Sequence, residues 1–152
     1  MEFEYLIIFL PLVAAIISGF FGKFLGSRNS EILTSLFVSI SSIFSFLIFY
    51  KVFNDGYTNN LEILTWIKSG SFNVNWSIKI DALSSVMLVV VTLVSSIVHI
   101  YSIGYMSHDP HKQRFMSYLS LFTFSMLMLV TSDNFLQLFF GWEGVGLCSY
   151  FL

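Results

Sequence analysis

The chain has 152 residues, of which 56% are apolar and 11% are charged, and its formal net charge is −2. Soluble domains have roughly 45–50% apolar and about 25% charged residues, so a soluble globular protein is excluded as the default interpretation. The charged residues are scattered and form no basic run, which argues against nucleic acid as a partner.

Four long blocks of the sequence contain no Asp, Glu, Lys or Arg. They comprise residues 5–22, 32–50, 82–107 and 115–132, and each has 18 residues or more. A helix of about 20 residues crosses a hydrocarbon core about 30 Å thick. The sequence therefore predicts an all-α polytopic membrane protein in contact with the lipid bilayer.

Residues 1–53 are predicted to form the first two transmembrane helices. The first covers about 5–21 and contains Pro11, which membrane helices tolerate because neighbouring groups satisfy the freed carbonyl. The second covers about 32–53, and Ser30 is its candidate N-cap. Because Glu2 stands where a secretory signal would be positive, we expect the first helix to be retained.

Residues 54–80 are predicted to form a loop with a β-hairpin outside the lipid. Apolar residues at 72, 74, 76, 78 and 80 alternate with polar residues at 73, 75, 77 and 79, which is a strand pattern. Residues 61–67 alternate more weakly, and Ser69-Gly70-Ser71 separates the two segments. Open strands leave backbone groups unpaired in lipid, so the hairpin belongs outside the membrane.

Residues 81–152 are predicted to form three further transmembrane helices. Asp81 is the candidate cap of a helix that ends near Gly104, and Asp109 is the candidate cap of one over 110–131. Asp133 is interpreted as a cap of a fifth helix, which begins at Asn134 and is truncated at Leu152. That ending predicts a fragment or a truncated product.

The distribution of basic residues predicts which side of the membrane each loop occupies. With the N-terminus outside, the short inner loops hold four basic residues and the longer outer segment holds three: Lys23, Arg28, Lys112 and Arg114 inside, and Lys51, Lys68 and Lys79 outside. The higher density inside favours this orientation, with the hairpin on the outer face.

Glu143 is the most informative single residue. Nine uncharged residues precede it and nine follow it, so it lies roughly 14 Å into the predicted fifth helix. An acid at the centre of a membrane helix costs roughly 2.5–3.5 kcal/mol and normally faces protein or water. A movable cation nearby could switch its protonation, which indicates a proton relay; the alternative is a structural carboxyl that bonds a neighbouring helix.

The residues around Glu143 predict its surroundings. Gly141, Gly144 and Cys148 form a small-residue face that lets another helix approach, and we expect this to help bury Glu143. Tyr150 shares the face of the acid with Leu136, Phe139, Phe140 and Leu147; packing is their simpler role, although the Tyr150 hydroxyl could donate a hydrogen bond.

Three histidines are further candidates. His99 could join a proton path, but a structural hydrogen bond is the simpler interpretation. His108 and His111 flank Asp109-Pro110, where a solvated loop is favoured over a metal site that would need more ligands. The single cysteine, Cys148, excludes an internal disulfide and a Cys-ligated cluster or zinc site built by this chain alone.

Three stretches resemble one known family. They are WSIKIDALSSVMLVVV at 76–91, the segment from His99 to Leu152, and within it GWEGVGLCSY at 141–150. They are similar to the N-terminal part of the largest antiporter-like membrane subunit of proton-pumping NADH:quinone oxidoreductase, respiratory complex I, the chain 5 or chain L family. The resemblance covers essentially this whole chain but about the first quarter of a family member.

The resemblance implies a fold and a function. It implies a bundle of more than a dozen helices, with Glu143 as one half of a Glu-Lys pair that drives proton movement. It also implies that this chain binds no cofactor and that NADH, flavin, iron–sulfur clusters and quinone belong to partner subunits, in a bacterial or mitochondrial inner membrane. Partners would be the other membrane-arm subunits of complex I.

Two other interpretations remain. A sodium/proton antiporter subunit shares the helix plan, although the GVGLCSY continuation after Glu143 argues against it. An inactive, truncated membrane fragment is the second. The expected fold is five transmembrane helices, the last truncated, with an extramembrane hairpin between the second and third.

Overall fold

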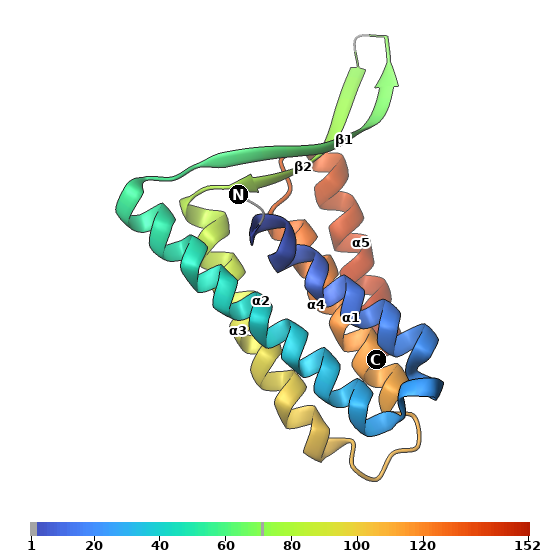
Figure 1. Cartoon of the computed structure of the whole chain (residues 1–152). Coiled ribbons are helices and arrows are strands. Elements are labelled where there is room, and N and C mark those ends of the chain that lie inside the picture. Colours follow the sequence, from blue (N-terminus) through green and yellow to red (C-terminus); the bar gives the residue numbers. More distant parts are fainter. Residues whose placement is uncertain (1–2, 71) are drawn as a thin grey trace.

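A computed structural model describes residues 3–70 and 72–152. Within these residues it has five helices and two strands in the predicted order: α1 (Phe3–Leu25), α2 (Ser27–Asp55), β1 (Asn59–Ser69), β2 (Phe72–Ile80), α3 (Ala82–Tyr105), α4 (Lys112–Val130) and α5 (Phe135–Phe151). The helices lie alongside one another, and the hairpin crosses the end of the bundle at which α1 begins (Figure 1). Glu2 and Ser71, which the sequence analysis used, lie outside the described residues.

The helical part of the predicted fold is confirmed, and three of the five described helices have the length and composition needed to cross a membrane. Among the described residues, α1, α2 and α3 are long and apolar enough to cross a membrane by length and composition. In contrast, α4 begins with Lys-Gln-Arg, and α5 has 17 residues. Membrane crossing by α4 and α5 therefore stays a prediction.

The hairpin is confirmed, with antiparallel strands that pair from Asn59 with Ile80 to Ser69 with Phe72. Gly70 in the connection has φ +60°, a conformation that glycine adopts without a side-chain penalty. Ile78 and Ile80 of β2 point into the bundle and are fully buried there. They join apolar side chains of four helices in one core: Ile7, Ile8, Ile48, Val52, Leu88, Leu127 and Met128.

Helix α1 packs against both α2 and α4, α2 packs against α3, and α4 packs against α5. Gly19 permits the close approach of α1 to α4, because a Cβ there would lie 2.8 Å from Ser117 Oγ. The Ser117 hydroxyl donates to the Ala15 carbonyl (2.7 Å), and the Ser18 hydroxyl donates to the Gln113 carbonyl (3.1 Å). Hydroxyls thus join these helices by satisfying backbone carbonyls.

Two predicted helix starts are wrong. Helix α2 begins after Gly26, which has φ +82°, and Ser30 lies fully buried inside the helix instead of capping it. The residue before α4 is His111, two residues later than expected. The Asp109 carboxylate accepts from the His111 backbone N–H (2.6 Å), so it closes a tight turn ahead of the helix instead of capping it.

The predicted cap of α3 is confirmed. The Asp81 carboxylate accepts from the Ser84 backbone N–H (2.8 Å), and the Ser84 hydroxyl accepts from the Asp81 N–H (2.7 Å). This reciprocal pair is a capping box, and the hydrogen bond from Ser84 lowers the pKa of Asp81 below its usual value. It sets the point at which the hairpin ends and α3 begins.

Candidate functional site

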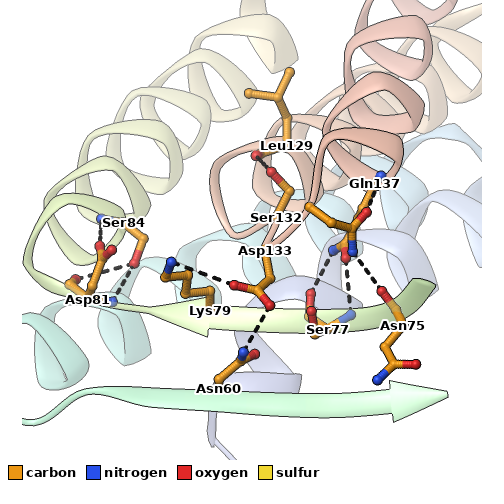
Figure 2. A network of polar contacts seen from close by, with 11 residues as sticks. Asn60, Asn75, Ser77, Lys79, Asp81, Ser84, Leu129, Ser132, Asp133 and Gln137 are labelled. Carbon is orange, nitrogen blue, oxygen red and sulfur yellow. Dashed lines mark hydrogen bonds and ion pairs between the residues drawn. The ribbon is translucent and has the colours of Figure 1, made fainter. Parts of the chain in front are cut away.

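The free edge of β2 is hydrogen-bonded to the turn between α4 and α5. Backbone groups at alternate positions of the strand make these bonds, because alternate backbone groups point to the same side. The bonds run from Asn134 Nδ2 to Asn75 O (2.8 Å), from Ser77 N to Gln137 Oε1 (3.0 Å), from Gln137 Nε2 to Ser77 O (2.7 Å) and from Lys79 N to Thr131 O (2.9 Å). The start of α5 is therefore fixed to the hairpin (Figure 2).

Gln137 makes the most complete of these contacts. Its side-chain amide both accepts from the Ser77 N–H and donates to the Ser77 carbonyl, as the backbone of a third strand would do. The two residues are almost fully inaccessible to solvent, with exposed fractions of 0% for Gln137 and 1% for Ser77. A polar side chain in the first turn of α5 thus satisfies two backbone groups that would otherwise be buried unpaired.

The cap of α5 is Asn134, whose side-chain oxygen accepts from the Gln137 N–H (2.9 Å). The interpretation of Asp133 as a cap is wrong. Its carboxylate faces the hairpin instead, 3.6 Å from the Lys79 ammonium, and accepts from the Asn60 side chain at 3.0 Å (Figure 2). Both strands of the hairpin thereby contact the α4–α5 turn.

The small-residue face of α5 packs against α4, as its spacing predicted. A Cβ on Gly141 would lie 2.8 Å from the backbone N and Cα of Leu129, and one on Gly144 would lie 2.8 Å from Ser125 Oγ. Cys148 on the same face is buried. Glycine is thus required at position 141, because α5 approaches the α4 backbone directly there.

Glu143 is the central residue of α5, about 12 Å from either end at 1.5 Å per residue. It lies two residues after Gly141, which places it roughly on the opposite side of the helix from α4. Its side chain is exposed in the described chain, so the expectation that the small-residue face would bury it is wrong. The small residues bring α4 to the other side of α5.

The surface around Glu143 is apolar and uncovered. Leu136, Phe139, Leu147 and Tyr150 share its side of α5 and are 37%, 60%, 55% and 84% exposed. Tyr150 lies two turns from Glu143, and its hydroxyl makes no hydrogen bond with any described residue. A carboxyl group at the centre of such a face can contact groups that approach from outside this chain.

His99 is fully buried between α3 and α4. Its Nδ1 lies 2.8 Å from the Ser95 carbonyl and its Nε2 lies 3.0 Å from Ser120 Oγ. A neutral imidazole that donates through Nδ1 and accepts at Nε2 satisfies both contacts. Ser95 Oγ also lies 2.5 Å from Thr123 Oγ1, so a second side-chain contact joins α3 to α4. His99 therefore has the hydrogen bonds expected of a structural histidine.

The other predicted candidates lie away from Glu143. His111 Nδ1 is 3.8 Å from an Asp109 oxygen at the end of the bundle opposite the hairpin, and His108 is exposed in the same loop. The described residues contain no group of three or more His, Cys, Asp or Glu side chains that could hold a metal ion.

Sequence reasoning missed three buried polar side chains. Gln137 gave one signal, an amide within an apolar stretch. Glu4 is 2% exposed and accepts from the Tyr57 hydroxyl (2.7 Å), and Glu31 is 5% exposed and lies 3.7 Å from the Lys112 ammonium. Both acids lie near helix starts, where exposure is the usual expectation, so nothing in the sequence singled them out.

Comparisons with known proteins agree on one family. Residues 66–116 match the family model described as the N-terminus of chain 5 of NADH-ubiquinone oxidoreductase (complex I). The chain is 58% identical to NADH-ubiquinone oxidoreductase chain 5 of Arabidopsis thaliana and 55% identical to that of Chondrus crispus. It is also 55% identical to NADH-quinone oxidoreductase subunit L of Rickettsia conorii.

Each of these alignments covers 97% of this chain and 22% of the relative. The chain thus spans less than a quarter of the length of the curated relatives that it matches. The alignments therefore extend over the hairpin, the α4–α5 turn and the part of α5 that carries Glu143. The chain belongs to the family of complex I chain 5 and subunit L proteins.

Proposed function

We propose that this chain acts within the proton-translocating membrane arm of NADH:quinone oxidoreductase. Its relatives are named as chain 5 or subunit L of that enzyme, and three of its helices can cross a membrane. In this proposal it assembles with other membrane-arm subunits in a bacterial or mitochondrial inner membrane. NADH, flavin, iron–sulfur clusters and quinone bind to partner subunits, which supply the redox energy.

Glu143 is the proposed proton carrier. The observation that supports this role is a single acid at the midpoint of an otherwise uncharged helix, on a side that the described chain leaves uncovered. In a membrane such a carboxyl needs either a proton or a cationic partner. A lysine from another part of the assembly, moving toward and away from Glu143, would cause it to release and rebind a proton.

The energies are compatible with this role. Moving one elementary charge across 100 mV requires about 2.3 kcal/mol. Two opposite charges about 4 Å apart interact by about 4 kcal/mol at an effective dielectric constant of 20. Separating and rejoining one Glu-Lys pair therefore involves enough free energy for one proton transfer.

The test replaces Glu143 with glutamine in the assembled enzyme. We expect Glu143→Gln to assemble but to lose most proton transport coupled to NADH oxidation, because glutamine cannot release a proton. Glu143→Asp, which keeps the acid, should retain part of it. Proton transport is measured in membrane vesicles by the quenching of a pH-sensitive dye during NADH oxidation, with an uncoupler as the zero point.

A matched control is Glu62→Gln, which removes an exposed acid from the hairpin. We expect this variant to transport protons at the wild-type rate. Wild-type transport in Glu143→Gln, with the complex fully assembled, would refute the relay role.

A further inference from the structure

A cavity of about 420 Å³ lies between α1 and α4, at the end of the bundle opposite the hairpin. Its volume is in the range of small-molecule sites, roughly 300–1,000 Å³. Its lining includes basic, aromatic and polar side chains, namely Lys23, His111, Arg114, Tyr118, Ser18 and Gln113. We refer to it as the α1–α4 cavity.

Lys23 and Arg114 in the α1–α4 cavity are free to bind a ligand. Within residues 3–70 and 72–152, Lys23 and Arg114 form no ion pair. Arg114 donates one hydrogen bond, to the Tyr118 hydroxyl (3.3 Å), which leaves most of its guanidinium donors available. No acid lines the cavity.

Two acids lie near this end of the bundle, and neither lines the cavity. Glu31 lies 3.7 Å from the Lys112 ammonium, and Asp109 lies 3.8 Å from His111, which is charged only when it is protonated. Lys23 and Arg114 therefore keep their positive charge uncompensated by the described chain. A cavity with this charge favours a ligand that carries a phosphate or another anionic group.

The surroundings favour a lipid over a soluble anion. Lys23 lies in the last turn of α1, a helix long and apolar enough to cross a membrane, so it belongs at the level of the headgroups. Phe20 and Phe24, next to the cavity residues Gly19 and Lys23 in the sequence, are 79% and 89% exposed. Acyl chains of a lipid at this end of α1 would meet exposed aromatic rings on the same helix.

We propose that the α1–α4 cavity binds the phosphate of an acidic phospholipid through Lys23 and Arg114. Basic pockets between membrane helices are suited to such headgroups, because the positive charges attract the phosphate. The bound lipid belongs to the leaflet at the α1–α2 and α3–α4 connections.

The experiment measures lipid binding to the full 152-residue chain in mixed micelles of detergent and phosphatidylcholine. Phosphatidylglycerol is titrated in, and the bound fraction is read by native mass spectrometry at two salt concentrations. We expect wild type to prefer phosphatidylglycerol to phosphatidylcholine, with binding that weakens as salt rises. Lys23→Gln and Arg114→Gln should each weaken it about fivefold, the effect of one basic residue near a membrane surface.

Arg28→Gln is the matched control, because Arg28 is an exposed cation at the same end of the bundle that does not line the cavity. We expect its affinity to stay within about twofold of wild type. Circular dichroism checks that each variant keeps its helices. If Lys23→Gln or Arg114→Gln is not recovered folded, Arg114→Lys replaces it. Its affinity should fall between the wild-type value and the fivefold loss, because lysine keeps the charge but not the planar group of arginine.

Three results would overturn the proposal. An equal loss in Arg28→Gln would show that diffuse surface charge attracts the lipid. Unchanged affinity in both cavity variants would show that Lys23 and Arg114 do not bind it. Displacement of the lipid by inorganic phosphate at a similar concentration would assign the cavity to a soluble anion. These results are independent of proton transport by Glu143.

Discussion

Removing the Gln137 amide should release the hairpin from α5 without unfolding the helices. In Gln137→Leu the side chain keeps its approximate volume but loses both hydrogen bonds to the Ser77 backbone. The Ser77 N–H and C=O then lie buried without partners. Each such group costs about 1–3 kcal/mol, so the docked hairpin should lose about 2–6 kcal/mol.

Hydrogen–deuterium exchange of the purified chain in detergent measures this loss directly. A loss of 2 kcal/mol corresponds to roughly 30-fold faster exchange of an amide that opens with the hairpin. We expect that acceleration in a peptide that contains Ser77 and Lys79, whose N–H groups bond to the α4–α5 turn. Amides in the middle of α2 should exchange at the wild-type rate, because the hairpin opens locally.

Gln113→Leu is the control for removing a glutamine from a helix of this bundle. The Gln113 side chain makes no hydrogen bond with the described residues, so we expect no change in exchange at Ser77. Unchanged exchange at Ser77 in Gln137→Leu itself would refute the reasoning. It would mean that Asn134, Thr131 and the contact of Asp133 with Lys79 dock the hairpin without Gln137.

Two further predictions concern stability. Gly141→Ala should lower the stability of the fold by about 1–3 kcal/mol, because the added Cβ meets the Leu129 backbone at 2.8 Å. Gly146→Ala, where the added Cβ meets open space, should raise it by about 0.5–1 kcal/mol. Thermal unfolding in detergent compares the two variants. The lowered pKa of Asp81 stabilises the fold above the unfolded-state pKa of about 3.9, and this contribution is lost as pH falls through the folded-state pKa. Acid titration should therefore destabilise wild type more than Asp81→Asn, and equal acid sensitivity would contradict this cause.

Local patterns predicted the elements well where a single signal was present. The alternation over 72–80 gave β2 with its boundaries, and Asp81 was the one strong cap candidate between the hairpin and α3. Individual cap residues were predicted wrongly where several cap candidates were close together. Near α4, Asp109 bonds the His111 N–H and the helix begins later, and near α5 Asn134 and Asp133 divide capping and hairpin contact between them.

The sequence predicted the position of Glu143 along its helix but not the side of the helix that neighbouring elements cover. Uncharged residues on both sides of Glu143 determine its position along α5, and that information is local. The side of α5 that α4 covers depends on tertiary packing, and the small residues showed only that some helix would approach. Gln137 was missed because its partner, Ser77, is 60 residues away and bonds through its backbone, which leaves no mark on residue type.

The contacts of α5 bear on how a relay at Glu143 would have to work. Gln137 and Asn134 fix the start of the helix to β2, and Gly141 fixes its rotation against the α4 backbone. Glu143 comes only two residues after Gly141, so a turn or slide of α5 that moved the acid appreciably would break these contacts. In the proposed relay the acid is therefore the stationary partner. The charge that approaches and leaves must come from beyond the uncovered side of α5.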